Sequence, residues 1–240
     1  MIDIPNKAVA YISLQRTGYL RGNRFYGWLK RIEKKNPLLL NLSSHIKNIF
    51  FANSIKDQYI NNLTAEYRAL TPYIPKQATN ILDIGSGLAL TNLFLYRHYD
   101  GSINIHLLDK TEIERDIYYG FNPKRTPFYN SMELAKEILT HNGVKEDCVY
   151  VYEVGNHQHC FGEKKYDLIT SYISLGFHYP VTTYLREIVL SLKDDGVLIL
   201  DVRKDTGQIQ ELEKCFKNID IISDEGKSMR VAAQFRALQK

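Results

Sequence analysis

From residue 79 onward, short apolar runs alternate with segments whose apolar residues recur at helical spacing. Five of the runs are rich in Ile, Leu, Val and Tyr, and their length of five or six residues predicts buried strands. These predicted strands cover residues 80–84, 103–108, 149–154, 166–170 and 197–202. Because strands that alternate with helices form parallel sheets with helices on both faces, the pattern predicts an α/β fold.

Helical patterns lie between and after these strands. They cover residues 88–96, 132–142, 181–192 and 208–216. Ser131 is expected to cap the second helix, and Gly143 to end it. A turn is expected over residues 193–196, and two further strands over residues 219–223 and 229–238.

Residues 1–74 differ from the main domain, which is expected to span residues 75–240. They predict a basic, aromatic and helical extension, with helices over residues 43–51 and 57–70. Residues 1–50 carry a net charge of +7, which leaves −3 for the rest of the chain. The aromatic side chains can pack on the main domain while Lys and Arg face water. The alternatives are a surface for an anionic partner, such as a nucleic acid, and a homodimer surface.

Composition limits the setting of the protein. No apolar run reaches 18 residues, so no membrane span is expected. The first residues lack the pattern of a secretory signal, and the three scattered cysteines form no C-x-x-C pair. A reduced, cytoplasmic protein is therefore expected. His157, His159 and Cys160 lie close together without a second ligand cluster, so no metal site is predicted.

The stretch with the clearest chemistry is Asp83-Ile-Gly85-Ser86-Gly87, at the end of the first predicted strand. The glycines allow a tight turn and a close approach of the backbone to a ligand, and the following helix offers free N–H groups. A dinucleotide fingerprint needs a third glycine at position 90, which is Leu. A carboxylate at Asp83 would repel a pyrophosphate and attract a cation. A strand followed by a glycine turn without any ligand is the alternative.

Asp109 directly follows the second predicted strand. An acid at this position can accept hydrogen bonds from both ribose hydroxyls of a bound nucleoside. More than one class of nucleoside-binding enzyme uses an acid there, so Asp109 predicts nucleoside binding without choosing the class. A cap at the strand end is the structural alternative.

The segment from Asp83 to Gly87 resembles the first motif of class I S-adenosylmethionine-dependent methyltransferases, with Ala89 where a third glycine often stands. The pattern from Leu192 to Asp201 resembles the L-x-P-G-G-x-L segment of that family, with Asp194-Asp195 replacing Pro-Gly. The resemblance covers about residues 75–240. It implies a doubly wound, mostly parallel seven-stranded sheet with a terminal antiparallel hairpin.

The resemblance also implies a set of residues for S-adenosyl-L-methionine. Asp83 and the turn of Gly85, Ser86 and Gly87 would hold the methionine portion, and Asp109 would hold the ribose. Asn156 follows Gly155, where the family often has an acid that meets the adenine amino group. Residues 171–180 resemble the fourth motif, where the methyl group and the acceptor meet. Ser171 at its start is assigned to the cofactor, and His178 is expected to act as a general base.

The acceptor is expected to be a hydroxyl of a small molecule or sugar, because the N/D-P-P-Y/F signature of amino methylation is absent. Residues 110–131 are long for a connection and rich in aromatic residues, so they predict either a lid that recognises the acceptor or a local core. Three alternatives stay open: methylation of a nucleic acid through the basic extension, a non-catalytic binding protein of the same fold, and an NAD(P)-dependent oxidoreductase.

Overall fold

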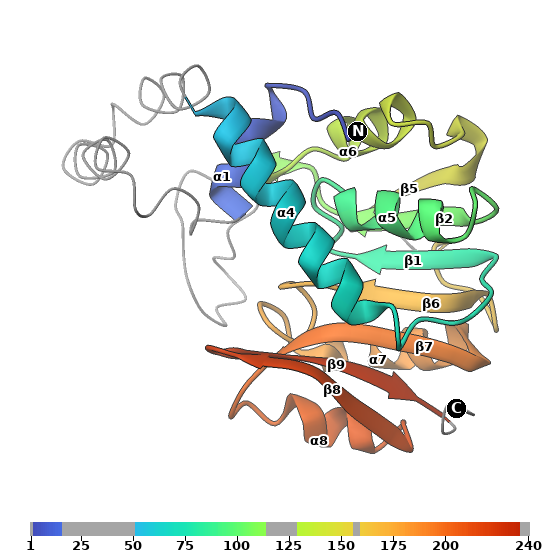
Figure 1. The fold of residues 1–240 in the computed structure, drawn as a ribbon. Helices are drawn as coiled ribbons and strands as arrows, with labels where there is room; N and C mark the ends of the chain where they lie inside the picture. Colours follow the sequence, from blue (N-terminus) through green and yellow to red (C-terminus); the bar gives the residue numbers. More distant parts are fainter. Residues whose placement is uncertain (1, 16–50, 114–128, 156–158, 236–240) are drawn as a thin grey trace. The chain divides into compact units, whose positions relative to one another are not determined.

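The structure is a computed structural model that describes residues 2–15, 51–113, 129–155 and 159–235 (Figure 1). Within these residues the chain forms two compact units, residues 1–65 and residues 66–240. The first unit contains helix α1 (Ala8–Gln15) and most of helix α4 (Ala52–Leu70). Lys56 Nζ donates a hydrogen bond of 2.7 Å to Asn6 Oδ1, which joins the two segments of this unit. The helix expected over residues 57–70 thus begins earlier, at Ala52.

The second unit is built on a seven-stranded sheet in the order β5-β2-β1-β6-β7-β9-β8. The first five strands in this order are parallel, and β9 and β8 form the antiparallel end. The strands are β1 (Asn80–Ile84), β2 (Asn104–Asp109), β5 (Val149–Glu153), β6 (Tyr166–Ser171), β7 (Leu192–Arg203), β8 (Asn218–Glu225) and β9 (Ser228–Gln234). The α/β fold class, the seven strands and the terminal hairpin are therefore confirmed.

Side chains alternate between the two faces of this sheet, as the period of a strand requires. One face carries Leu82, Leu198 and Leu200, which belong to a buried cluster with residues of α7 (Leu185–Ser191) and α8 (Gln208–Glu213). The opposite face carries Asp83, which contacts α5 (Leu90–His98). Helix α6 (Met132–His141) packs beside α5, and the Ser131 hydroxyl caps it by accepting the Leu134 N–H, as expected.

The turn expected over residues 193–196 is instead a bulge inside β7. Tyr166 pairs with Leu192 and Leu168 pairs with Val197, so the residues between Leu192 and Val197 are extra in the ladder. Lys193 Nζ donates to Asp167 Oδ1 on β6 over 2.7 Å, and this ion pair holds the bulge against the neighbouring strand. Strand β7 therefore pairs with β6 on both sides of the polar segment 193–196. The periodicity of the sequence does not show this, because a bulge and a turn have the same polar pattern.

Two helices are shorter than their patterns suggest. The segment expected as one helix over 181–192 forms a 3-10 turn, η3 (Val181–Thr183), followed by α7. The Val181 N–H is bound by Gln208 Oε1 at 2.7 Å, so a long-range contact satisfies the start of this segment. Helix α8 ends at Glu213 rather than at Phe216.

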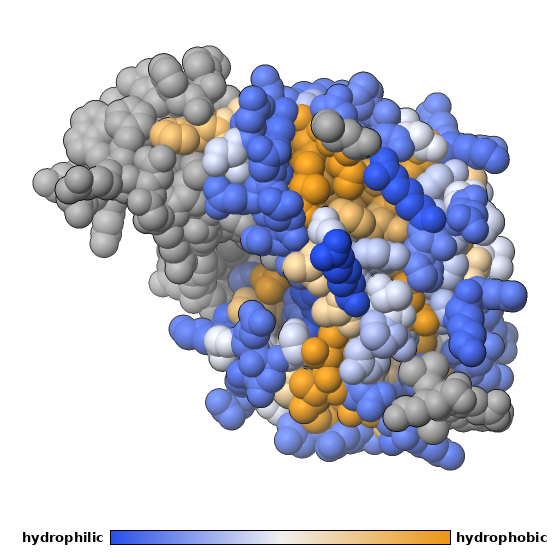
Figure 2. All heavy atoms as spheres, in the orientation of Figure 1, coloured by the Kyte–Doolittle hydropathy of each residue, from blue (hydrophilic) through white to orange (hydrophobic). Residues whose placement is uncertain are grey.

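The second unit begins at Glu66, before the linker where the sequence places the boundary. The last turn of α4 belongs to this second unit, within which Glu66 pairs with Arg230 and the Tyr67 ring stacks on Phe94 at 5.5 Å. Residues 71–75 are therefore a connection inside this unit. Among the described residues no helix is long and apolar enough to cross a membrane, and in the view of Figure 2 apolar patches lie between hydrophilic side chains.

Candidate functional site

Asp83 lies at the carboxyl end of β1, fully enclosed by neighbouring side chains. Its two oxygens accept hydrogen bonds from Asn92 Nδ2 at 2.6 Å and from Thr170 Oγ1 at 2.9 Å. Burial raises the pKa of Asp83 from 3.8 to about 6, although these two hydrogen bonds oppose the rise. A cationic ligand near this carboxylate would favour its ionised form.

The turn after β1 has the left-handed backbone that glycine favours. Gly85 has φ +73° and Gly87 has φ +54°. A Cβ on Gly85 would lie 2.1 Å from Ser174 Oγ, so this glycine is also required by packing within the protein. Ala89, at the position of the family's third glycine, is likewise left-handed with φ +56°, a strained conformation for alanine. The Ser86 hydroxyl is buried without a hydrogen-bond partner among the described residues.

Asp109 ends β2, and its carboxylate accepts three N–H groups. Gly87 N donates to Oδ2 at 2.8 Å, Asn130 Nδ2 to the same oxygen at 2.9 Å, and Lys110 N to Oδ1 at 2.7 Å. Burial raises the pKa of Asp109 to about 6 despite these bonds. A carboxylate has about four acceptor positions, so about one remains for a ligand hydroxyl. The sequence predicted Asp109 at the end of β2 and the glycine turn after β1, and the structure adds the contact between them and the role of Asn130.

Asn130 comes from the end of the segment that the sequence set apart as an insertion. Short strands β3 (Glu112–Ile113) and β4 (Tyr129–Asn130) pair antiparallel and so close the base of this segment. The residues between them lie outside the described part of the chain, as do Asn156 and His157, so the predictions made for them stay predictions. Among the described residues, no group of three or more His, Cys, Asp or Glu is arranged to hold a metal ion.

Ser171 lies at the carboxyl end of β6, where the sequence placed it. Its hydroxyl donates to the Ile84 carbonyl at 2.7 Å and accepts the Leu175 N–H at 3.0 Å. Both bonds are internal, so Ser171 ties β1 to the start of the segment 171–180. Ile173 in this segment has φ +52°, which is a strained value for a β-branched residue. The Ile173 N–H is held by Asp201 Oδ2 at 3.1 Å.

A buried ion network that the sequence missed supports this strained segment. Arg230 Nε and Nη2 donate to the two oxygens of Asp201 at 2.7 and 2.9 Å, and Arg230 Nη1 donates to Glu66 at 3.1 Å. The guanidinium lies 4.5 Å from the ring centre of Tyr172. Burial raises the pKa of Tyr172, so its hydroxyl stays protonated. The sequence does contain a sign of this network, because Asp201 and Arg230 are charged residues inside the otherwise apolar patterns of β7 and β9.

His178 lies in the same segment, with its main-chain N–H bound to the Ser174 carbonyl at 2.7 Å. Burial and the nearby Arg203 guanidinium lower the pKa of His178, so the imidazole is neutral at neutral pH. Its Nδ1 is buried without a hydrogen-bond partner among the described residues. A neutral imidazole with an open acceptor nitrogen can take a proton.

Buried polar atoms without partners gather at this edge of the sheet. Among the described residues they include Ser86 Oγ, Asn92 Oδ1, Asn130 Oδ1, Tyr172 Oη and His178 Nδ1, whereas His106 Nε2 on β2 and Gln234 Oε1 on β9 are unpartnered atoms within strands. Such atoms are rare in folded proteins because each costs about 1–3 kcal/mol, and a bound ligand can satisfy them. The carboxyl edge of the sheet, between β1, β2 and β6, is therefore the candidate ligand site.

Many solved structures resemble this chain, and three of them are described below. One is a protein of Nostoc punctiforme provisionally named an O-methyltransferase (TM-score 0.53, 14% identity, 72% of this chain and 55% of that chain covered). The second is a protein of Bordetella parapertussis provisionally named an exported protein (TM-score 0.52, 13% identity, 72% and 67% covered). The third is the S-adenosylmethionine-dependent methyltransferase SibL in its apo form (TM-score 0.50, 15% identity, 95% and 69% covered).

This chain spans about half the length of the Nostoc protein. No protein-family model matches the sequence, and no curated protein matches it. The structural likeness shows that the chain has the fold of the class I methyltransferases, with the strand order described above. At these identities the likeness does not extend to the ligand or the reaction.

Proposed function

We propose that the protein is an S-adenosylmethionine-dependent methyltransferase that acts on a hydroxyl of a small molecule or sugar. The observation that carries the proposal is the group of unpartnered buried polar atoms at the edge of the sheet that holds Asp83 and Asp109. They lie where doubly wound α/β sheets bind ligands, beyond the carboxyl ends of the strands. Both carboxylates have a raised pKa, which a ligand bearing positive charge would reverse.

The residues of this edge fit the proposed cofactor. Asp83 and the turn at Gly85–Gly87 would hold the methionine portion, and the free acceptor position of Asp109 would take one ribose hydroxyl. Asn130 Oδ1 is a second acceptor beside Asp109, so the pair can serve both hydroxyls of a ribose. Asn156 remains the proposed partner of the adenine. Ser171 would act indirectly, because its hydroxyl is used within the protein.

When bound, the cofactor supplies a methyl group on a sulfonium sulfur. The acceptor oxygen would take this methyl group by in-line displacement, with the thioether of S-adenosylhomocysteine as the leaving group. The protein then has two tasks, the alignment of the acceptor and the removal of its hydroxyl proton. His178 is proposed to take the proton at Nδ1 in the tautomer that carries its own proton on Nε2, because the imidazole is neutral near pH 7 and Nδ1 has no other partner among the described residues.

Calorimetric titration with S-adenosylmethionine and S-adenosylhomocysteine tests the cofactor. Micromolar binding of both is expected, and Asp109→Asn should weaken it at least tenfold, because an amide accepts fewer hydrogen bonds than a carboxylate. Glu163→Gln is the matched control, since Glu163 is an exposed acid away from these strands. Absence of binding to the wild-type protein would overturn the proposal, and equal binding to both variants would remove Asp109 from the site.

A transfer assay with radiolabelled methyl groups then tests the reaction. Sugars and small phenols are the first acceptors to try, and RNA is the second. His178→Gln should lower the turnover rate by at least a hundredfold while cofactor affinity stays unchanged. Cofactor binding without transfer to any acceptor would favour a non-catalytic binding protein of this fold. The nucleic-acid alternative depends on the basic extension, most of which lies outside the described residues.

A further inference from the structure

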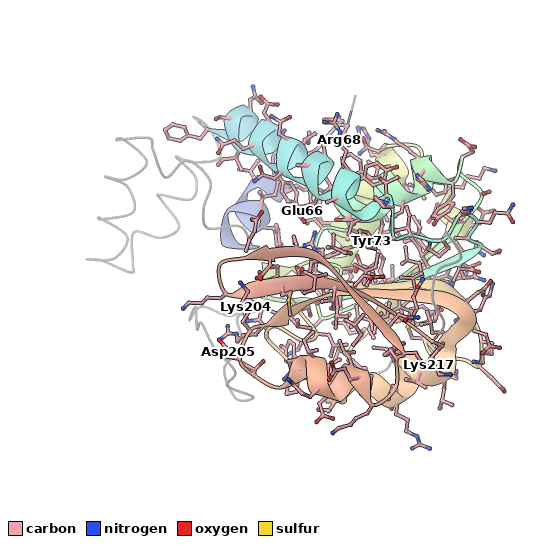
Figure 3. All side chains as sticks on the ribbon, turned by 60° about the horizontal axis from the view of Figure 1, so that its bottom comes forward. Glu66, Arg68, Tyr73, Lys204, Asp205 and Lys217 are labelled. Carbon is pink, nitrogen blue, oxygen red and sulfur yellow. The ribbon has the colours of Figure 1, made fainter. Side chains whose placement is uncertain are left out.

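A cavity lies at the carboxyl edge of the sheet, lined by residues other than those proposed for the cofactor. It has a volume of about 600 Å³, within the range of pockets that bind small molecules. The loop from β7 to α8 forms one wall, and the hairpin of β8 and β9 contributes Asp224 and Met229. Figure 3 shows Lys204 and Asp205 of this loop near one end of the β7–β9 layer, with Lys217 near the opposite end.

This pocket adjoins the segment that contains His178. Arg203 lines the pocket, and its main-chain N–H donates to the Gly176 carbonyl at 2.9 Å. The Arg203 guanidinium lies 4.7 Å from the ring centre of Phe177, and that ring makes an edge contact with His178 at 5.0 Å. A Cβ on Gly176 would lie 2.9 Å from the Asp201 carbonyl oxygen, so this segment is packed tightly against β7. The pocket wall and the proposed base are therefore held together.

Most polar groups of the pocket are already paired. Lys204 forms an ion pair with Asp224, and the Thr206 hydroxyl donates to the Arg203 carbonyl. Gln208 uses its amide oxygen on the Val181 N–H and its amide nitrogen on the Thr206 carbonyl. These contacts fix the shape of the pocket and leave few groups for a ligand.

Asp205 and Gln210 are the polar side chains of the pocket for which no side-chain partner is found among the described residues. Asp205 is held in a left-handed backbone with φ +58°, which Asp and Asn tolerate better than most residues. Its carboxylate can accept bonds from two hydroxyls, and the Gln210 amide can donate and accept. Ile209 and Met229 add apolar surface that suits the C–H face of a ring.

The charges of the pocket argue against an anionic ligand. Arg203 and Lys204 are balanced by Asp205 and Asp224, so the lining has no net charge. A nucleic acid requires an excess of Lys and Arg, because its affinity comes mainly from phosphate contacts. A neutral molecule with several hydroxyl groups fits both the balance of charge and the open acceptors.

We infer that this pocket binds the acceptor, and that the acceptor is a neutral sugar or similar polyol held by Asp205. The inference rests on the proposed methyl transfer and adds the substrate class and its binding residues. Asp205 would orient the ring through its hydroxyls, beside the wall that Arg203 and Phe177 connect to His178.

Two methionines make separate reporters for the two parts of the site. Met132 Sδ lies 3.4 Å from Asn130 Nδ2, beside the proposed ribose position, whereas Met229 lines the pocket. The chain has three methionines, so labelling with methyl-¹³C methionine gives a simple spectrum, and Met132→Leu and Met229→Leu assign the two signals. S-adenosylhomocysteine should shift the Met132 signal. Methyl glucoside, methyl rhamnoside and myo-inositol should shift the Met229 signal saturably in at least one case.

Asp205→Asn keeps the shape and the backbone preference of the side chain and removes its charge. It should weaken the sugar-induced Met229 shift at least fivefold and leave the response of Met132 to S-adenosylhomocysteine unchanged. Asp100→Asn is the matched control, because Asp100 is also exposed and left-handed, with φ +51°, and does not line the pocket.

Each result decides one part of the inference. A missing Met229 response to all three neutral probes overturns it, and so does full retention of that response in Asp205→Asn. A stronger Met229 response to glucuronic acid or to a short RNA would also overturn it, because the pocket would then select anions. If S-adenosylhomocysteine does not shift the Met132 signal, the proposed cofactor is wrong. The inference about the pocket is then still tested by the response of the Met229 signal to the neutral probes.

Discussion

At the scale of single residues, Tyr172 has the most unusual environment in the candidate site. Its ring is covered by the Arg230 guanidinium, and its hydroxyl is buried with no partner among the described residues. Burial is the main cause of the raised pKa of Tyr172, and the carboxylates of Asp83 and Asp201 add to it, so the hydroxyl remains protonated. An unpaired buried hydroxyl is costly unless a ligand uses it.

Tyr172→Phe should therefore keep or slightly raise the stability of the ligand-free protein, by up to about 1 kcal/mol. The same change should reduce the thermal stabilisation produced by S-adenosylhomocysteine, because the ligand loses a partner. Tyr99→Phe is the matched control: the Tyr99 hydroxyl donates to the Pro75 carbonyl at 2.7 Å, so its loss should lower stability by about 1 kcal/mol. Unchanged ligand stabilisation in Tyr172→Phe would show that the ligand does not use this hydroxyl.

Sequence reasoning found the residues that follow strand ends and missed those whose role depends on distant partners. Asp83, Asp109 and the glycine turn were predictable, because parallel strands bring their carboxyl ends to one edge. Asp201 and Arg230 looked like interruptions of apolar strands, and only the pairing of β7 with β9 shows that they face each other. Asn130 could not be placed, because its approach to Asp109 depends on pairing across 15 residues that lie outside the described part.

At the scale of elements, the close contact between the glycine turn and the segment 171–180 can be tested by adding one methyl group to the turn. Gly85→Ala should destabilise the protein by at least about 2 kcal/mol, because the new Cβ would lie 2.1 Å from Ser174 Oγ and the backbone is left-handed. Gly143→Ala has an even more positive φ of +92°, with no atom within 4 Å of the new Cβ, so it measures the backbone cost alone. Denaturant unfolding gives both values.

The double variant Gly85→Ala with Ser174→Gly separates the two costs in this turn. Removal of the Ser174 side chain should recover the steric part of the loss and leave a residual close to that of Gly143→Ala. If the double variant is no more stable than Gly85→Ala, then the contact with Ser174 does not explain this glycine.

The ion pair between Asp201 on β7 and Arg230 on β9, which supports the strained Ile173, gives another prediction. Arg230→Leu should destabilise the protein by about 3–5 kcal/mol, because Asp201 would keep a buried charge without its partner. The double variant Asp201→Leu with Arg230→Leu should be more stable than Arg230→Leu alone, since no uncompensated charge remains. Thermal unfolding of both variants checks this order, and a double variant that is less stable than Arg230→Leu would show that the bond from Ile173 to Asp201 matters more than the charge.

At the scale of the whole molecule, buried titratable groups couple stability to pH in opposite directions. Asp83 and Asp109 have folded pKa values of about 6, above the ordinary 3.8, so the folded state binds more protons between these values. Their contribution to stability is complete below pH 3.8 and is lost as pH rises through 6, by about 3 kcal/mol for each carboxyl. Burial lowers the pKa of His106 to about 4, so its contribution has the opposite sign.

The difference in free energy of unfolding between the wild type and Asp109→Asn isolates the pH dependence that comes from the Asp109 carboxyl. Relative to Asp109→Asn, the wild type should lose free energy of unfolding between pH 4.5 and 7, while His106 affects both proteins equally and cancels. Urea unfolding at several pH values measures this difference. A wild type that gains stability over the variant across this range would mean that Asp109 is ionised in the ligand-free fold.

The same two carboxyls predict how the intact protein responds to its cofactor. S-adenosylmethionine carries a sulfonium and an ammonium, which favour ionised carboxylates, so binding should lower both pKa values and release protons near pH 6. Affinity should accordingly rise between pH 5 and 7.5, and S-adenosylhomocysteine, which lacks the sulfonium, should show a smaller rise. Calorimetry at pH 6 in two buffers with different ionisation enthalpies counts the protons. Proton uptake would show that the carboxyls do not face the positive charges, and Asp83 would then act only in holding β1 to β6 and α5.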